Sequence, residues 1–409
     1  MKLLFIHQGF PSQFTRLGVE LNRQGDFECY ALVSNQCMTE AAQRIGLPHF
    51  SFEPDSRLQR DKELQPDYSP LEVFERIMRN AHGIHVAVEK LCATHHFDAV
   101  IGHAGFGATA GLRRILHPST ALLAYAELPG VESRECRPEF PLVLDEHLER
   151  FALQSMVFTS VLEADLAIVP SRHARSFYPP ELQPKIRTQI EGFSLKEYPA
   201  DRTALGLPAE GKLEGFFGQT LESTRGFDIF VQVARRLKEH DDSLRFLVIG
   251  REATQHGNEH HYLNDESFKR YALRQAGVAE DMFIWRDVLP YTQFRKHLAC
   301  LDLAILPYFG GAANWSFFEA MCSGVPMVTS NRAFIPEYAE DQREAFLCDP
   351  SDVDMQVRRS VELLQDTAKA KAFGAAARTR ARKEFDIAAV AGKYAALIHE
   401  AIRVRTQVE

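Results

Sequence analysis

The feature that most constrains the fold of this 409-residue chain is a regular alternation of two kinds of segment. Short apolar runs rich in branched residues alternate with longer stretches in which apolar residues recur at helical spacing. This order is typical of a parallel sheet covered by helices on both faces, because each parallel strand needs a crossover to the next. The predicted strands are LLFIH (3–7), ECYALV (28–33), DAVIGH (98–103), ALLAYA (121–126), DLAIVP (165–170), GFFGQ (215–219), RFLVIG (245–250), MFIWR (282–286), DLAILP (302–307) and PMVTS (326–330).

The predicted strands form two series, and a chain of this length exceeds what one ordinary hydrophobic core holds. A stretch over residues 192–212 that contains prolines and glycines separates the two series and reads as a linker. We therefore predict an α/β protein of two Rossmann-like doubly wound domains. The N-terminal domain spans 1–195, the second domain spans 196–385, and a helix at 386–409 packs back on the first domain.

The composition excludes several classes of protein. Hydrophobic residues make up 45% and charged residues 25% of the chain, as in globular proteins, and no apolar run is long enough to span a membrane. The first apolar run is shorter than the core of a signal peptide. Seven cysteines without a CxxC pair argue against a disulfide framework, and a net charge of -8 does not favour nucleic-acid binding. We expect a cytoplasmic protein with no transmembrane segment, for which peripheral membrane contact stays open.

The segment WSFFEAMCSGVPMVT (315–329) places one carboxylate, Glu319, on an otherwise apolar helix that Gly324 and Pro326 end. A buried carboxylate is unfavourable unless it is paired or hydrogen-bonded, so either protein groups or ligand hydroxyls satisfy it. The preceding loop, PYFGGAAN (307–314), contains paired glycines that allow backbone amides to approach a ligand. This position favours a ligand with vicinal hydroxyls.

The segment GFFGQTLESTRGFDIF (215–230) predicts an anion site. A strand ends at Gly218, a polar loop carries Arg225, and Gly226 leads into a helix whose N-terminus favours negative charge. Arg225 is suited to a diphosphate, because its guanidinium matches phosphate oxygens. The alternative is an ordinary solvated loop arginine.

Two further loops follow predicted strands in the first half. HQGFPSQF (7–14) places His7 and Gln8 at the end of the first strand, where they line a ligand cleft or satisfy local backbone. His103 ends another strand, before a glycine-rich loop, and Glu127 ends the strand ALLAYA. Both side chains are candidates for contact with a polar substrate, with ordinary structural roles as the alternative.

Two acidic or histidine-rich stretches resemble metal sites but are interpreted otherwise. Asp352 and Asp354 open a helix, where acidic residues favour the helix dipole without a metal. His256 and His260 have a spacing that aligns two ligands only on a helix, and the Gly-Asn pair between them disfavours one. We predict no metal site and no resident cofactor.

Taken together, these segments resemble the retaining glycosyltransferases of family 4, which have the GT-B architecture of two facing Rossmann-like domains. The strongest likeness is in FFEAMCSGVPMVTSNRAFIPEY (317–338), and GQTLESTRGFDIF (218–230) resembles the family's diphosphate loop. The resemblance covers essentially the whole chain. It implies a metal-independent hexosyltransferase that moves a sugar from a nucleoside diphosphate sugar to an acceptor hydroxyl, with retention of the anomeric configuration, in glycan or polysaccharide biosynthesis.

The likeness also implies roles for individual residues. The implied catalytic residues are His103, Arg225 and Glu319. Glu319 would bind the donor ribose. The implied donor-binding residues are Gly218, Gln219, Arg225, Arg251, Gly310, Gly311, Ala312, Ala313, Asn314 and Glu319. The implied acceptor-side residues are His7, Gln8, Gly9, Phe10, His103 and Glu127.

The sequence departs from the family pattern at two positions. The family usually has a second glutamate where this chain has Gly311, so contacts to the donor sugar would come from the amides of 310–314. The usual arginine of the diphosphate loop is Gln219, which leaves Arg225, helped by Arg251, to neutralise the phosphates. Two alternatives therefore stay open: a nucleotide-sugar epimerase of the same fold, and a non-catalytic GT-B scaffold. The expected partners are the donor and an acceptor that is a glycan, a lipid-linked sugar, a protein or a small molecule.

Overall fold

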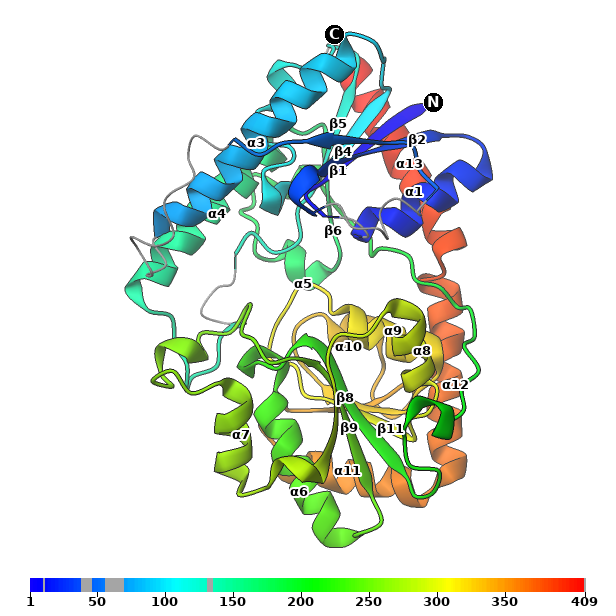
Figure 1. Cartoon of the computed structure of the whole chain (residues 1–409). Coiled ribbons are helices and arrows are strands. Elements are labelled where there is room, and N and C mark those ends of the chain that lie inside the picture. Colours follow the sequence, from blue (N-terminus) through cyan, green and yellow to red (C-terminus); the bar gives the residue numbers. More distant parts are fainter. Residues whose placement is uncertain (10–11, 38–45, 56–69, 131–134, 408–409) are drawn as a thin grey trace. The chain divides into compact units, whose positions relative to one another are not determined.

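The computed structural model describes residues 1–9, 12–37, 46–55, 70–130 and 135–407, and divides the chain into two compact units (Figure 1). Unit 1 comprises Met1–Gly130, Val143–Gly192 and Ile387–Glu409. Unit 2 comprises Val131–Leu142 and Phe193–Asp386. A short segment from the first half of the sequence thus belongs to the unit that is otherwise built from the second half.

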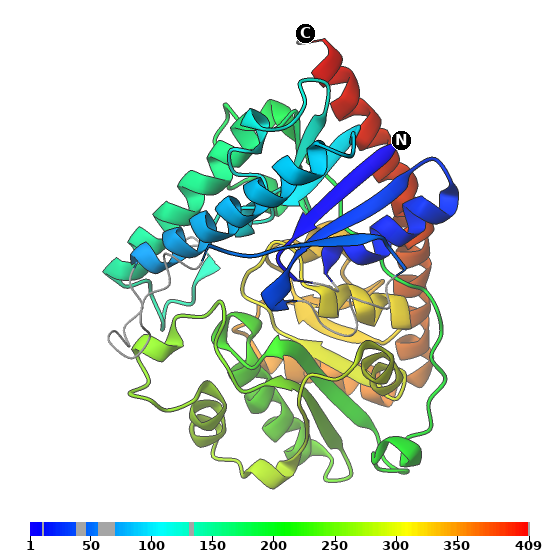
Figure 2. The same cartoon turned by 45° about the horizontal axis from the view of Figure 1, so that its top comes forward.

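Unit 1 is built on a seven-stranded parallel sheet with the order β3-β2-β1-β4-β5-β6-β7. Its strands are β1 (Lys2–His7), β2 (Glu28–Ser34), β3 (His49–Phe52), β4 (Ala99–His103), β5 (Ala121–Tyr125), β6 (Leu166–Val169) and β7 (Ile186–Thr188). Its helices are α1 (Gln13–Gln24), α3 (Pro70–Cys92), α4 (Leu144–Glu163), α5 (Arg172–Arg175) and α13 (Ile387–Thr406). Helices α1 and α13 cover one face of the sheet, and α3 and α4 pack together on the other (Figure 2).

The core of unit 1 joins the two ends of the sequence. Leu3 and Phe5 of β1 point to the same face, because alternate residues of a strand do so, and they pack with Phe14 of α1. Tyr394 and Ile398 of α13 belong to the same buried cluster. The C-terminal helix is therefore an integral part of the unit that contains the N-terminal strand.

Unit 2 is built on a six-stranded parallel sheet with the order β10-β9-β8-β11-β12-β13. Its strands are β8 (Leu213–Thr220), β9 (Arg245–Arg251), β10 (Phe283–Arg286), β11 (Leu303–Leu306), β12 (Met327–Ser330) and β13 (Phe346–Cys348). Its helices are α6 (Phe227–His240), α7 (Phe268–Ala276), α8 (Tyr291–Leu298), α9 (Trp315–Ser323), α10 (Ile335–Tyr338), α11 (Val353–Gln365) and α12 (Thr367–Glu384).

Two neighbouring phenylalanines show how both faces of the unit 2 sheet are covered. Phe216 of β8 contacts Phe227 and Phe230 at the start of α6. Phe217, the next residue, points to the opposite face and contacts Phe294 of α8. A strand that is apolar on both faces is typical of a sheet buried between two helical layers.

Each sheet has one point where the strand order reverses. In unit 1 it lies between β1 and β4, and in unit 2 between β8 and β11. Ligands of doubly wound proteins bind beyond the carboxyl ends of the strands at this point, because the connections there diverge to opposite faces. His7 and His103 end β1 and β4, and the loops 221–226 and 307–314 follow β8 and β11.

The predicted fold class is confirmed, and each of the ten predicted strands corresponds to an observed strand. Among the described residues, β3, β7 and β13 were not predicted. All three lie at the edge of a sheet and have three or four residues. An edge strand pairs on one side only and tolerates polar residues, so its sequence, HFSF in β3, carries little of the apolar signal. No helix in the described part of the chain has the length and apolar character needed to cross a membrane.

One buried carboxyl group stands out in the core of unit 2. Glu214 of β8 is completely buried, and neither of its carboxyl oxygens has a hydrogen-bond partner among the described residues. Burial raises the pKa of Glu214 well above its ordinary value of 4.5, and the neighbouring acidic residues Asp302 and Asp241 add to this effect. The folded protein therefore favours the neutral carboxylic acid.

The Glu214→Gln variant should become more stable than the parent protein as the pH rises above 4.5. The unfolded parent releases its proton above that pH and the folded parent retains it, so the parent loses stability with increasing pH, by about 1.4 kcal/mol per pH unit at most. Glutamine has the same shape and no proton to release. Urea unfolding of both proteins from pH 4 to pH 8 measures the difference. A difference that does not change with pH would contradict this account.

Candidate functional site

A group of buried polar side chains lies at the carboxyl ends of β1, β4 and β5 in unit 1. The exposed fraction is 6% for His7 and 4% for His103, and their ring centroids are 5.4 Å apart with the rings nearly perpendicular. Nε2 of His7 and Nδ1 of His103 have no hydrogen-bond partner in the described ranges of the chain. Buried polar atoms are usually paired, so an unpaired nitrogen on each of these two neighbouring rings indicates a place for a polar ligand.

Glu127 completes this group from the end of β5. Its Oε2 lies 3.4 Å from Nε2 of His103, and its Oε1 accepts a hydrogen bond of 3.2 Å from the side-chain amide of Gln13. Its backbone has a φ of +30°, which is rare outside glycine. The hydroxyl of Tyr178 holds this turn by donating to the carbonyl oxygens of Ala126 and Glu127. The Glu127 side chain is partly exposed, at 34%.

The charges of this group are set by its surroundings. Burial, together with the neighbouring His103, lowers the pKa of His7 to about 3. His7 is therefore neutral at physiological pH. Burial alone would raise the pKa of Glu127, but His103 and Gln13 outweigh that effect and hold the pKa below its ordinary value. The group thus pairs a negative carboxylate with neutral His7, which suits a hydroxyl ligand better than an anion.

The other residues predicted for the acceptor side are Gln8, Gly9 and Phe10. Gln8 accepts a hydrogen bond of 3.3 Å from Asn80, and Gly9 lies against His7, whose Nδ1 is 2.7 Å from the Gly9 carbonyl oxygen. Phe10 lies outside the described residues. Sequence reasoning missed Gln13 and Tyr178. Gln13 stands in the quoted HQGFPSQF loop, so the motif contained it, whereas Tyr178 carried no signal.

In unit 2, the loops after β8 and β11 are fixed against each other. Gly226 has a φ of +70°, and a Cβ atom there would lie 2.1 Å from the carbonyl oxygen of Pro307, so only glycine fits. The amide of Phe309 also donates a hydrogen bond of 2.9 Å to the carbonyl of Thr224. The two loops at the switch point therefore form one rigid surface.

Arg225 is held on this surface through one nitrogen. Its Nε donates to Oε1 of Glu222 at 2.9 Å and to the hydroxyl of Thr220 at 3.3 Å. Its two terminal nitrogens form no hydrogen bond with the residues that the structure describes. Gly218 allows this arrangement, because a Cβ there would lie 3.1 Å from Cδ of Arg225. The terminal nitrogens are thus available to an anion.

Glu222 is the support for Arg225, and sequence reasoning missed it. It is completely buried and accepts hydrogen bonds from the amides of Gln255 and His256, at 2.7 and 2.8 Å. Burial alone would raise its pKa, but the charges of Arg225 and His256 and these amides lower it to about 2. A charged carboxylate therefore persists beneath Arg225 across the physiological pH range.

The remaining predicted donor residues surround this surface. Gln219 and Arg251 are exposed at the ends of β8 and β9. Residues 310–314 are half-buried, and Asn314 caps α9 by accepting a hydrogen bond from the amide of Ser316. The structure therefore places the predicted donor loops at the same switch point.

Glu319 has a protein partner. Its Oε2 accepts hydrogen bonds from Arg295 at 2.8 Å and from the hydroxyl of Tyr291 at 3.0 Å. The side chains of Glu319 and Arg295 are 3% and 2% exposed. Arg295 also donates to the carbonyl of Ser194. Glu319 is thus one end of a buried ion pair, and Arg295 is a further residue that sequence reasoning missed.

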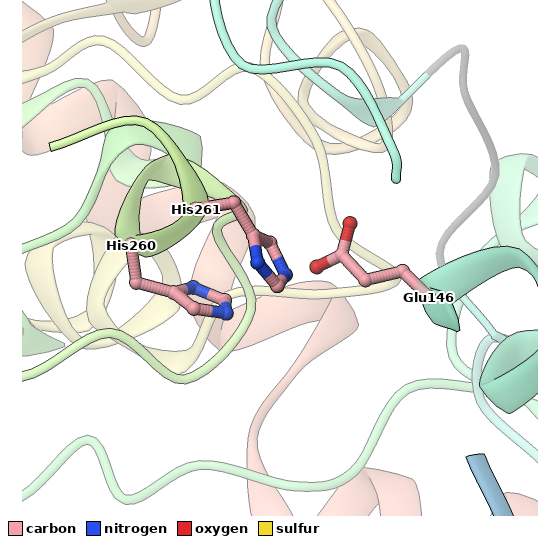
Figure 3. A group of neighbouring side chains, drawn as sticks. All are labelled: Glu146, His260 and His261. Atoms are coloured by element: carbon pink, nitrogen blue, oxygen red, sulfur yellow. The ribbon is translucent and has the colours of Figure 1, made fainter. Parts of the chain in front are cut away.

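The histidine-rich stretch contains a short 3₁₀ turn, η9 (Glu259–His261). Figure 3 shows the side chains of His260 and His261 from this turn. Their ring centroids are 4.0 Å apart. Glu259 is buried and accepts from the amide of Ser223 at 3.1 Å. Glu146, labelled in the same figure, belongs to unit 1, where it accepts from the amide of Val143. We assign no metal to these groups.

Asp352 and Asp354 lie at the N-terminus of α11. Asp352 caps α11 by accepting a hydrogen bond of 2.8 Å from the amide of Met355. Asp354 pairs with Arg236 of α6. Both contacts agree with the interpretation of this stretch as the start of a helix.

Comparisons with known proteins identify both halves of the chain as glycosyltransferase domains. The model of the glycosyl transferase family 4 group matches residues 28–198, and the model of glycosyl transferases group 1 matches residues 212–366. The two matches together cover most of the chain. It belongs to the family 4, group 1 glycosyltransferases. A search of curated proteins found no match.

Solved structures of similar fold extend over both units. Sucrose-phosphate synthase from Thermosynechococcus elongatus has a TM-score of 0.74 at 15% identity and covers 98% of each chain. Anabaena HepE, solved with UDP-glucose, has a TM-score of 0.69 at 16% identity and covers 98% of this chain and 99% of its own. A Listeria monocytogenes protein described as a UDP-N-acetylglucosamine 2-epimerase has a TM-score of 0.62 at 11% identity, with 97% and 95% covered. At such identities the likeness shows the fold, and the predicted GT-B fold is confirmed.

The Glu319→Ala variant should destabilise this glycosyltransferase by about 3–5 kcal/mol, because it leaves the buried charge of Arg295 unpaired. A double variant, Glu319→Leu with Arg295→Met, removes both charges and should recover most of that loss. Urea unfolding of the three proteins measures these changes. A single variant as stable as the parent would show that the ion pair contributes little.

Proposed function

We propose that this glycosyltransferase moves a sugar from a nucleoside diphosphate sugar to an acceptor hydroxyl with retention of the anomeric configuration. In this proposal the donor binds at the switch point of unit 2 and the acceptor at the polar group of unit 1. The reaction serves glycan or glycoconjugate biosynthesis in the cytoplasm. The positive charge at the donor comes from protein groups, and no metal is assigned a role.

The observation that carries the proposal is the position of Arg225. Arg225 lies two residues before Phe227, where α6 begins, and the N-terminal amides of that helix also favour an anion. Glu222 fixes the guanidinium from behind without using its terminal nitrogens. A diphosphate is the anion that best matches a forked arginine next to a helix N-terminus.

The same groups suit the chemistry of transfer. The bond between the anomeric carbon and the diphosphate oxygen breaks, and negative charge accumulates on the leaving diphosphate. Arg225 and the α6 amides stabilise that charge as it develops. The acceptor oxygen forms the new bond to the anomeric carbon on the same face, and its proton passes to the leaving phosphate. This route needs no enzymic nucleophile.

Glu319 and His103 have the remaining roles in the proposal. Glu319 binds the ribose hydroxyls of the donor, and Arg295 balances its charge within unit 2. His103 and Glu127 bind the acceptor hydroxyl, because the partly exposed Glu127 side chain and the unpaired ring nitrogen of His103 together offer it hydrogen-bonding groups. HepE was solved with UDP-glucose, so UDP-glucose is the first donor to test.

The first test is a thermal-shift screen with UDP, GDP, ADP and TDP and their glucose conjugates. A ligand that binds the folded state raises the unfolding temperature. The Arg225→Ala variant should bind the preferred nucleoside diphosphate and its glucose conjugate at least about tenfold more weakly, because a charge-assisted hydrogen bond is lost. Its turnover should also be slower. The matched control is Arg236→Ala, which removes an exposed arginine of α6 that pairs with Asp354.

The outcomes separate the proposal from its two alternatives. Release of an altered sugar from the donor without any acceptor would favour the epimerase. Absence of binding for every nucleotide tested would favour the non-catalytic scaffold. Equal binding by Arg225→Ala and the parent protein would contradict the assignment of the diphosphate to this loop.

The Glu127→Gln variant tests the acceptor side. It removes the charge beside His103 and keeps the shape, so we expect kcat/KM for the acceptor to fall about tenfold while nucleotide affinity stays within twofold. The pKa of Glu127 is lowered, so the parent protein should retain this contribution down to pH values below the ordinary carboxyl pKa and lose it only in more acidic solution. Initial rates between pH 4 and pH 8 measure the effect. A parallel loss of nucleotide affinity would place Glu127 on the donor side.

A further inference from the structure

A short strap, residues 135–142, belongs to unit 2 although it lies between β5 and α4 of unit 1 in the sequence. Its Phe140 is 4% exposed and lies in the hydrophobic core of unit 2, where it contacts Phe268 and Tyr271 of α7. The side-chain amide of Asn258 donates to the carbonyl of Phe140 at 3.2 Å. The strap is therefore a built part of the unit that carries the donor loops.

A buried arginine orients the strap toward those loops. The Arg137 side chain is 5% exposed, and its Nη1 forms a 2.6 Å ion pair with Asp228 in the first turn of α6. Its guanidinium lies 4.5 Å from the centroid of the Phe309 ring, in the loop after β11. Arg137 thus ties the strap both to the helix after the Arg225 loop and to the loop that precedes α9.

Glu135 contacts Gly310 and Gly311 in the loop after β11. Its Oε2 accepts a hydrogen bond of 2.7 Å from the amide of Gly311, and the residue is 4% exposed. A Cβ atom at Gly310 would lie 2.6 Å from Oε2, and Gly311 has a φ of +122°. The positive φ favours glycine at 311, and a side chain at 310 would displace the Glu135 carboxylate.

We propose that Glu135 is a positioning residue for the donor sugar, and that it acts by fixing the amide and conformation of Gly311 from the buried side of the loop. The inference rests on the proposed function, in which residues 310–314 bind the sugar end of the donor. This chain has Gly311 where the family pattern has a glutamate, and the amide of Gly311 donates to a carboxylate from a distant part of the sequence. Glu135 therefore determines the preference for the sugar-bearing nucleotide over the bare diphosphate.

Three variants of the full-length protein test this role. The readout is the ratio of affinities for UDP-glucose and UDP, or for the corresponding pair that binds the parent protein. Glu135→Ala removes the acceptor of the Gly311 amide and should lower the ratio about tenfold. Glu135→Gln keeps an acceptor oxygen without the charge and should lower it about threefold. Glu239→Gln changes a carboxylate on α6 that is 63% exposed, and it should leave the ratio unchanged.

The ratio distinguishes positioning from a merely structural role. Loss of affinity for both ligands in equal proportion, with a lower unfolding temperature, would overturn the proposal. So would an unchanged ratio in Glu135→Gln if Glu135→Ala fails to fold. A parent protein that binds and transfers the sugar while no Glu135 variant changes the ratio would leave the proposed function standing and refute this inference alone. A parent protein that binds none of the pairs would refute the proposed function and this inference with it.

Discussion

The constraint on which the rest of the structure depends is that parallel strands end at the same edge of their sheet. In each unit the strand order reverses once, between β1 and β4 and between β8 and β11, and the connections diverge there. That divergence leaves room for side chains and loop amides beyond the strand ends. His7 and His103 lie at the first of these points, and the Arg225 loop lies at the second. Residues far apart in the sequence meet because their strands are neighbours.

Unit 2 also depends on three ion pairs between a buried carboxylate and an arginine. Glu222 holds Arg225, Glu319 pairs with Arg295, and Asp228 pairs with Arg137, each with a nitrogen to oxygen distance below 3 Å. A buried charge is costly unless it is paired, so each pair fixes the orientation of both side chains. The arginine beside the helix start can then present its remaining donors in one direction. The same pairing explains how apolar segments tolerate single carboxylates.

Much of the fold was predictable because it follows local patterns. Buried parallel strands are short apolar runs, and each predicted run is a strand in the structure. The edge strands β3, β7 and β13 were missed because three or four residues are too few to give a clear strand pattern. The candidate loops were predictable for the same reason, since they directly follow those strands. Their partners were not: Tyr178 and Arg295 lie far along the chain from the residues they contact, and nothing in their local sequence marks them.

The sequence by itself determined the two parallel sheets, the family and the loops at the strand ends, because strand pattern and motif spacing are local properties of the chain. Only the tertiary structure showed that Glu319 is paired with Arg295 and that Glu135 reaches Gly311. Contacts of this kind depend on how separate segments pack, and many side chains of suitable chemistry could have made them. Once the strap is fixed in the core of unit 2 through Phe140 and Arg137, the position of Glu135 is also fixed.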